Sequence, residues 1–188
     1  MQKEKMLKGE IYNPFEDKTL TLERENCKKL CYEFNHTKIE DKEKRIELIK
    51  KILGKTKENF WIEPFFWCDY GYNIQIGKNF YANHNLTILD PAKVIFGDNV
   101  FIGPNCGFYT AEHPLNPKMR NQGLEWAKEI VVKDNVWFGG NVTVLSGTTI
   151  GNNCTIGAGS VVTKDIPDNS VAVGCPARVI KKINEENI

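Results

Sequence analysis

The stretch Ile150-Gly151-Asn152-Asn153-Cys154-Thr155-Ile156-Gly157-Ala158-Gly159-Ser160-Val161-Val162 repeats its pattern every six residues. An aliphatic residue opens each segment, glycine follows it, and the fifth residue is small or apolar. A period of six is neither the roughly 3.6 residues of an α-helix nor the plain alternation of a hairpin sheet. It indicates a short strand, a tight turn and another short strand, with the first side chain pointing into a narrow prism.

The same pattern extends outward from this stretch over most of the chain. Asparagine and glycine would supply the unusual backbone angles at each bend. Three segments make one coil, and each coil buries its interior only against its neighbours. The sequence therefore predicts a mainly β protein, a parallel β-helix of hexapeptide repeats. Its eleven segments open at Ile76, Ala82, Ile88, Phe96, Ile102, Val132, Phe138, Val144, Ile150, Ile156 and Val162.

Residues 109–129 interrupt the repeat. This segment is polar, contains two prolines and keeps no six-residue register. Connections of this length are usually functional or disordered, and the aromatic and apolar residues here argue against disorder. We expect one long loop that is extruded from the coils.

The chain changes character near residue 59. Residues 1–58 hold 27 of the 49 charged side chains and only two of the fifteen glycines. Apolar residues recur there at helical spacing, which predicts a helical layer packed on the β-helix. We therefore expect an N-terminal helical segment over 1–58, a β-helix over 59–170 and a C-terminal tail over 171–188 that packs on the β-helix.

Composition excludes several classes of protein. The 188 residues are 41% hydrophobic, and 25 basic against 24 acidic residues give a net charge of +1. Such a chain has no bulk electrostatic attraction to nucleic acid or to an anionic membrane. No apolar run approaches a membrane span, and no signal peptide is recognisable, so we expect a cytoplasmic protein. The six cysteines are expected to be free, and Cys27 and Cys31 to be a helix-packing pair rather than a metal motif.

Several blocks of sequence resemble the maltose/galactoside O-acetyltransferase family over nearly the whole chain, and the maltose acetyltransferases more closely. The resemblance implies that the β-helix is left-handed, although the general rule for parallel crossovers favours the right hand. It also implies an acetyl-CoA-dependent transfer to a sugar hydroxyl such as that of maltose, glucose or a galactoside. The blocks are Gly9–Tyr12, Tyr32–His36, Cys68–Ile74, Asn79–Asn83, Tyr109–Pro114, Gly123–Trp126, Asn135–Gly140, Val161–Pro167 and Gly174–Arg178.

The transfer needs a base that takes the hydroxyl proton, and imidazole suits this work near neutral pH. The chain has three histidines, His36, His84 and His113. The resemblance assigns the base to His113, in the interrupting loop. Glu125 is expected to support it through the other ring nitrogen, and a solvated loop carboxylate is the alternative.

The resemblance also implies which residues bind the two substrates. Asp69 and Asn83 match positions that bind the acceptor, and both are also residue types that stabilise turns. Asp90 is a further candidate, either to bind the acceptor or to cap a turn. A backbone N–H near Gly140 is the candidate for stabilising the oxyanion. The residues that match acetyl-CoA contacts are Trp137, Gly140, Ala158, Thr163, Lys164, Arg178 and Lys181. Alternatively, Arg178 and Lys181 belong to a solvated basic C-terminal tail.

The expected assembly is a homotrimer with sites between subunits, which acts on acetyl-CoA and a small sugar and requires no metal. A hexapeptide acyltransferase for another small acceptor, such as an amino acid, an antibiotic or an amino sugar, is the first alternative. A γ-type carbonic anhydrase on the same fold would need three histidines at one metal, and His36 lies outside the coils. A non-catalytic scaffold would have no need of a long loop that carries His113.

Overall fold

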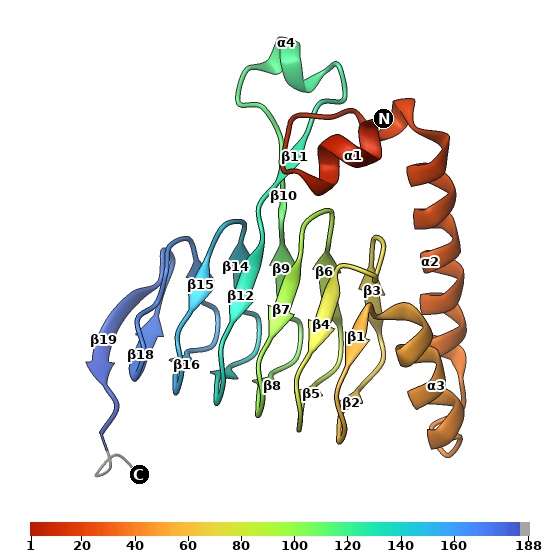
Figure 1. Ribbon diagram of the computed structural model, residues 1–188. Coiled ribbons are helices and arrows are strands. Elements are labelled where there is room, and N and C mark those ends of the chain that lie inside the picture. The colour runs from red at the N-terminus through yellow and green to blue at the C-terminus, as the bar shows by residue number, and fades with distance from the viewer. Residues whose placement is uncertain (185–188) are drawn as a thin grey trace.

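The computed structural model describes residues 1–184 and shows a three-sided stack of coils (Figure 1). The strands of each side pair in parallel, apart from the last strand of the second sheet. The first sheet contains β1 (Lys55–Thr56), β4 (Ile74–Ile76), β7 (Val94–Phe96), β12 (Ile130–Val132) and β15 (Thr149–Ile150). The second contains β2 (Trp61–Ile62), β5 (Tyr81–Ala82), β8 (Phe101–Ile102), β13 (Trp137–Phe138), β16 (Thr155–Ile156), β18 (Ser170–Val173) and β19 (Arg178–Lys182). The third contains β3 (Phe66–Cys68), β6 (Leu86–Leu89), β9 (Gly107–Tyr109), β14 (Thr143–Leu145) and β17 (Val161–Val162).

The interior of this prism is built as the repeat predicts. All eleven residues that open the hexapeptide segments are buried, with no more than 3% of their surface exposed. Four phenylalanines form a row of tilted and edge-to-face ring contacts through the core, with successive ring centroids 5.0–5.3 Å apart, and they are Phe80, Phe96, Phe108 and Phe138. Each coil therefore buries its interior against the coils on either side.

Asparagine and glycine both occupy the corners of the coils. Within residues 1–184, nine asparagines adopt positive φ angles of 55–63°, and most stand at the fourth position of a segment. Their side chains hydrogen-bond from coil to coil, as in the 2.8 Å bond from Asn79 to Asn99. Second-position glycines such as Gly139 do not have positive φ; a Cβ on Gly139 would lie 2.6 Å from the backbone nitrogen of Ala158. The expectation that glycine also supplies unusual angles holds at the fourth position, where Gly147 and Gly159 adopt φ angles of 68° and 72°, whereas the second-position glycines supply space between coils.

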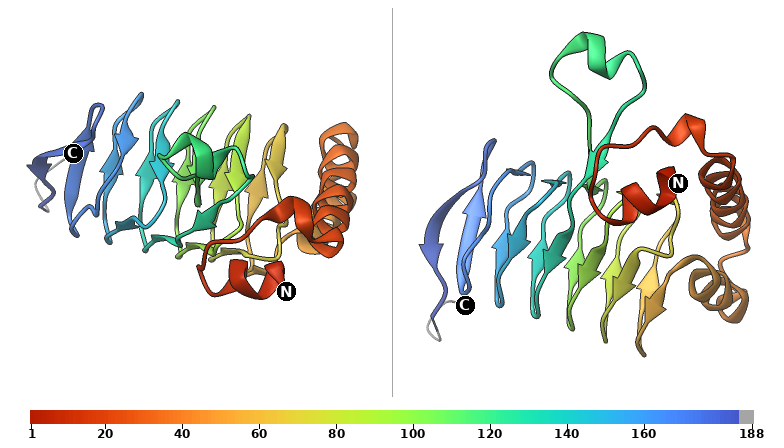
Figure 2. Two further views of the ribbon diagram at one scale, coloured as in Figure 1. Left: turned by 90° about the horizontal axis from the view of Figure 1, so that it is seen from above. Right: turned by 45° about the horizontal axis from the view of Figure 1, so that its top comes forward.

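Two helices cover the open end of the first coil (Figure 2). They are α2 (Lys18–His36), whose first N–H groups are capped by Asp17, and α3 (Lys42–Ile52). Arg45 of α3 is 2% exposed, lies over the rings of Phe34 and Trp61, and donates to the Ile62 carbonyl at 3.1 Å. None of the helices in the described part of the chain is long and apolar enough to span a membrane.

The parallel sheets extend from Lys55 to Val173, slightly beyond the 59–170 that the sequence indicates. β19 then pairs antiparallel with β18 at the last edge. The expected C-terminal tail thus begins as sheet, and its residues 185–188 lie outside the described residues.

The interrupting segment stands out from the coils as a hairpin (Figure 1). Its stem is the antiparallel pair β10 (Ala111–Glu112) and β11 (Trp126–Ala127), and its tip carries the short helix α4 (Pro117–Arg120). The N-terminal elements α1 (Gln2–Leu7) and η1 (Pro14–Glu16) precede α2, and α1 lies beside the base of the hairpin. An antiparallel bridge joins Tyr12, between these two elements, to Glu125 of the hairpin.

Candidate active site

His113 follows the first strand of the hairpin, and its ring is exposed to solvent. Its Nδ1 lies 3.2 Å from the carbonyl oxygen of Leu124 on the opposite arm. A carbonyl oxygen can only accept, so Nδ1 carries the proton and donates it. In the neutral imidazole, Nε2 is therefore the nitrogen with a free lone pair, as a general base requires.

Glu125 lies between His113 and the N-terminal segment. It is 8% exposed, and its Oε2 is 3.9 Å from His113 Nε2. The Tyr12 hydroxyl donates to Oε1, and two backbone hydrogen bonds of 2.9 Å join Tyr12 and Glu125. We expected Glu125 to hold the other ring nitrogen, but the Leu124 carbonyl holds it and Glu125 lies near Nε2. Glu125 is thus placed to stabilise an imidazolium by its charge.

Asp90 has no exposed surface and holds the turn that follows β3. Its carboxylate accepts backbone N–H bonds from Asp69, Tyr70 and Gly71 at 3.0, 2.9 and 2.7 Å. Burial raises the pKa of this carboxyl to about 7, and the hydrogen bonds only partly offset that effect. Of the two roles left open by the sequence, turn cap and acceptor ligand, the structure therefore supports the cap.

Asp69, at the start of that turn, remains half exposed. Burial raises the pKa of its carboxyl, while the charge of Arg24 on α2 lowers it and that of Glu125 raises it. The carboxylate thus lies in the field of both an arginine and the hairpin glutamate. Such a group can accept hydrogen bonds from hydroxyl groups.

Asn83 follows β5 and is also half exposed. Its Oδ1 accepts the His84 N–H at 2.7 Å, so part of its side chain serves a local turn. His84 itself bonds the Pro64 carbonyl through Nδ1, and His36 stacks on Tyr32 of α2. Among the three histidines, His113 is therefore the one that combines a fixed tautomer with a nearby carboxylate.

Small residues leave the backbone accessible at the corner between the second and third sheets. Here Gly140 faces Pro104 with room for a Cβ at 3.4 Å, and Ala158 is exposed on the next coil. Among residues 1–184, the Gly140 N–H has no hydrogen-bond acceptor. This corner offers a groove edge and an unpaired donor. Trp137, on the preceding strand β13, is 56% exposed beside it.

Comparison with known proteins agrees with this arrangement. Residues 5–57 match the maltose acetyltransferase hexapeptide capping motif, and residues 129–164 match the bacterial transferase hexapeptide of six repeats. A galactoside O-acetyltransferase of Escherichia coli K12 is 49% identical over 85% of this chain and 79% of its own length. The crystal structure of a maltose O-acetyltransferase from Clostridium difficile 630 has a TM-score of 0.96 and 49% identity, covering 98% of each chain.

The chain belongs to the maltose/galactoside O-acetyltransferase family. A structure of galactoside acetyltransferase in complex with coenzyme A, 44% identical, has a TM-score of 0.95 and covers 98% of this chain and 92% of that one. Membership in the family confirms the left-handed β-helix and the acetyltransferase class that the sequence predicts.

The remaining residues expected to face acetyl-CoA in this family member are exposed. Thr163 and Lys164 follow β17, while Arg178 and Lys181 lie on β19. Arg178 is exposed, and its Nη1 donates to the Ala177 carbonyl at 2.8 Å. The hairpin leaves the coils between the third and the first sheet, whereas Trp137 lies in the second. One chain therefore does not bring the His113 hairpin and the Trp137 face together.

Sequence reasoning missed three side chains of this region. Tyr12 lies within a block that carries the family resemblance, but nothing in its spacing points to Glu125. In the sequence Arg24 is one of many charged residues on a solvated helix, but in the structure its charge lowers the pKa of the Asp69 carboxyl. The Tyr70 hydroxyl is buried without a hydrogen-bond partner among the described residues, which only coordinates can reveal.

Proposed function

We propose that this protein moves an acetyl group from acetyl-CoA to a hydroxyl of a sugar such as maltose, glucose or a galactoside. Direct attack by the hydroxyl, with His113 as general base, is the proposed route. The main support for this role is the 3.2 Å hydrogen bond from His113 Nδ1 to the Leu124 carbonyl, which leaves Nε2 as the proton acceptor. The names of the similar proteins and the coenzyme A complex of one of them support the choice of substrates.

In the proposed reaction, acetyl-CoA supplies an activated thioester. His113 Nε2 takes the proton from the sugar hydroxyl as its oxygen attacks the thioester carbon, and Glu125 stabilises the resulting imidazolium from 3.9 Å. The N–H of Gly140 faces the oxyanion. His113 then returns the proton to the departing sulfur, so the protein ends in its starting state.

Asp69 and Asn83 are proposed to bind hydroxyl groups of the acceptor. Asp69 has an accessible carboxylate, and the Asn83 amide NH₂ has no acceptor among the described residues. Asp90 takes part by fixing the backbone that carries Asp69. On the donor side, we propose that the pantetheine arm lies along the small-residue corner beside Trp137. It would pass Gly140, Ala158, Thr163 and Lys164 and reach phosphate contacts at Arg178 and Lys181.

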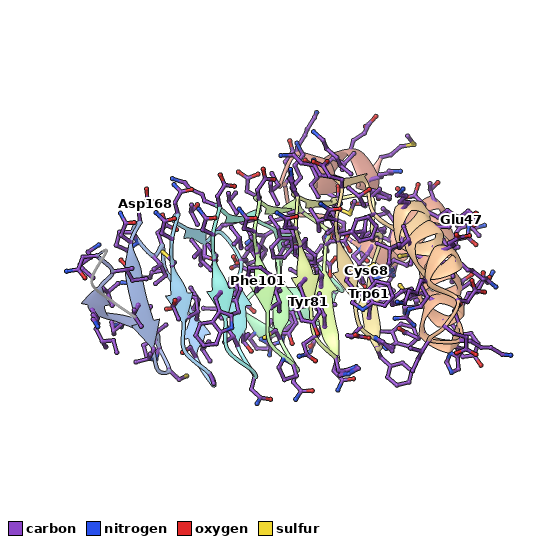
Figure 3. The ribbon with its side chains drawn as sticks, turned by 90° about the horizontal axis from the view of Figure 1, so that it is seen from below. Glu47, Trp61, Cys68, Tyr81, Phe101 and Asp168 are labelled. Carbon is purple, nitrogen blue, oxygen red and sulfur yellow. The ribbon has the colours of Figure 1, made fainter. Side chains whose placement is uncertain are left out.

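A homotrimer with sites between subunits is the proposed assembly. An aromatic ladder runs along the outer face of the second sheet, where Trp61, Tyr81, Phe101 and Trp137 are paired in register from strand to strand. Figure 3 shows Trp61, Tyr81 and Phe101 on neighbouring strands. Phe101 is 47% and Trp137 56% exposed, and monomers rarely leave such a contiguous apolar surface open. Packing of this face against a second copy would bring another subunit's His113 hairpin to the Trp137 groove. Light scattering that gives a monomer at micromolar concentration would contradict the assembly.

The six cysteines are free, as is usual in a reducing compartment such as the cytoplasm. The proposed reaction is tested by an acceptor screen in which release of free coenzyme A thiol is followed. Sugars with free hydroxyl groups should accelerate thiol release, and the acetylated sugar should be recovered. Preferential acetylation of an amino acid, an antibiotic amine or an amino sugar nitrogen would instead support the other acyltransferase class.

A further inference from the structure

Three cysteine side chains meet between the helical cap and the first coil. Cys27 and Cys31 lie one turn apart on α2, and Cys68 ends β3. The Sγ of Cys68 is 3.4 Å from that of Cys27 and 3.8 Å from that of Cys31, and all three sulfurs lie within 4.8 Å of one another. None of the three residues is more than 4% exposed. Figure 3 shows Cys68 close to the helices.

Three buried sulfurs at these separations can coordinate one metal ion, because cysteine thiolates are metal ligands.

The number and type of ligands narrow the choice of cation. Soft thiolates select Cu(I), zinc or iron–sulfur clusters. Structural zinc sites are almost always four-coordinate, and iron–sulfur clusters take four protein ligands. Within residues 1–184, no fourth histidine, cysteine or carboxylate joins the three sulfurs. An ion about 2.3 Å from each of three sulfurs needs sulfur separations of about 4 Å, which the observed spacing approaches.

We propose that Cys27, Cys31 and Cys68 bind one Cu(I) ion, which joins α2 to the first coil. The ion coordinates the three sulfurs, and the thiol protons that it displaces pass to water. A cavity of about 430 Å³, lined in part by Cys27, Leu30, Tyr70 and Tyr72, adjoins the cluster and provides an entry route. The three sulfur ligands are not among the residues proposed to carry out acetyl transfer.

The test is an anaerobic titration of the reduced full-length protein with Cu(I), in competition with a chromophoric Cu(I) chelator. We expect one ion per chain, a thiolate-to-copper charge-transfer band and a higher thermal unfolding midpoint. Cys27→Ser, Cys31→Ser and Cys68→Ser each remove a direct ligand. Each should therefore weaken Cu(I) binding by more than the roughly 10–100-fold that loss of an outer-shell residue costs. Cys175→Ser, at an exposed position, and Cys106→Ala, in the coils, are matched controls that should bind normally.

Unchanged Cu(I) affinity in Cys68→Ser, or loss of binding in Cys175→Ser, would overturn the site. Tighter binding of Zn²⁺ than of Cu(I) would overturn the choice of ion. X-ray absorption at the copper edge of the wild-type protein needs no variant and remains decisive if a serine variant fails to fold. A first shell of three sulfurs supports the proposal, and a shell of nitrogen or oxygen contradicts it.

Discussion

Tyr12 and Glu125 are joined by two backbone hydrogen bonds and by a hydrogen bond between their side chains, although 113 positions separate them in the chain. A fourth hydrogen bond, from the Asn13 side chain to the Gln122 carbonyl at 2.8 Å, lies beside them. The N-terminal segment thus holds the arm of the hairpin that faces His113. Both the position and the hydrogen bonding of Glu125 depend on this segment.

Tyr12→Phe should lower the rate of acetyl transfer about tenfold while leaving coenzyme A binding unchanged. Removal of the hydroxyl deprives the buried Glu125 carboxylate of a donor, a defect worth roughly 1–3 kcal/mol, and the carboxylate is then free to move relative to His113. Steady-state kcat and KM, with circular dichroism as a check of folding, measure the effect. Tyr32→Phe, on the exposed face of α2, is the control. Equal kinetics in the two variants would remove Tyr12 from any positioning role.

Asp90 should make folding stability fall as the pH rises. The pKa of its carboxyl goes from 3.8 unfolded to about 7 in the fold, because burial disfavours the ion. Between about pH 4 and pH 7 the folded state therefore holds a proton that the unfolded chain has lost. Raising the pH through this window lowers stability, by a few kcal/mol in all at about 1.4 kcal/mol per pKa unit.

The pH dependence is measured as the difference between wild type and Asp90→Asn in urea unfolding from pH 4 to pH 8. The asparagine variant should lack this downward slope, although it loses an acceptor for the Gly71 N–H at every pH. Asp168→Asn is the control, since the backbone N–H of Asn152 lowers the pKa of that exposed carboxyl, in the direction opposite to the shift of Asp90. Parallel pH profiles for wild type and Asp90→Asn would refute the assignment.

Gly139→Ala should lower the stability of the fold, whereas Gly140→Ala should weaken acetyl-CoA binding without destabilising the fold. A Cβ on Gly139 would lie 2.6 Å from the Ala158 nitrogen, so this variant should lose about 1–3 kcal/mol of stability. A Cβ on Gly140 meets Pro104 at an ordinary 3.4 Å, so that variant should fold normally. Its methyl group would nevertheless narrow the proposed groove and raise the KM for acetyl-CoA. A destabilised Gly140→Ala with normal KM would contradict the groove assignment.

The periodic parts of the fold could be predicted because every coil repeats the same constraint. A residue such as Phe138 or Ile156 must face inward wherever it opens a segment, and the sequence alone shows that register. The helical cap follows from apolar spacing in the same way, as Cys27, Cys31 and Phe34 show. Local periodicity is sufficient for these features, and it does not require knowledge of distant contacts.

The site was less predictable because its contacts join segments with no common period. Asp90 has the residue type of both a ligand and a cap, and only the three N–H groups around it decide between them. From the sequence, Cys27 and Cys31 are interpreted as a packing pair, because only the fold shows that β3 places Cys68 against them. The tautomer of His113 likewise depends on a carbonyl 11 residues away, across a hairpin whose stem the sequence did not reveal.

His113→Ala tests the reaction most directly. Loss of a general base should lower the rate of acetyl transfer by ~10²–10⁴-fold. Coenzyme A should still bind, because Trp137, Ala158 and Lys164 lie on other coils. His36→Ala, which removes a ring stacked on Tyr32, is the matched control and should keep wild-type turnover. Because the hydroxyl itself attacks, intact-mass analysis of wild type with acetyl-CoA alone should show no acetylated protein. Near-normal turnover in His113→Ala would exclude it as the base, and a stable acetyl-enzyme that passes its group to sugar would replace direct transfer with a covalent route.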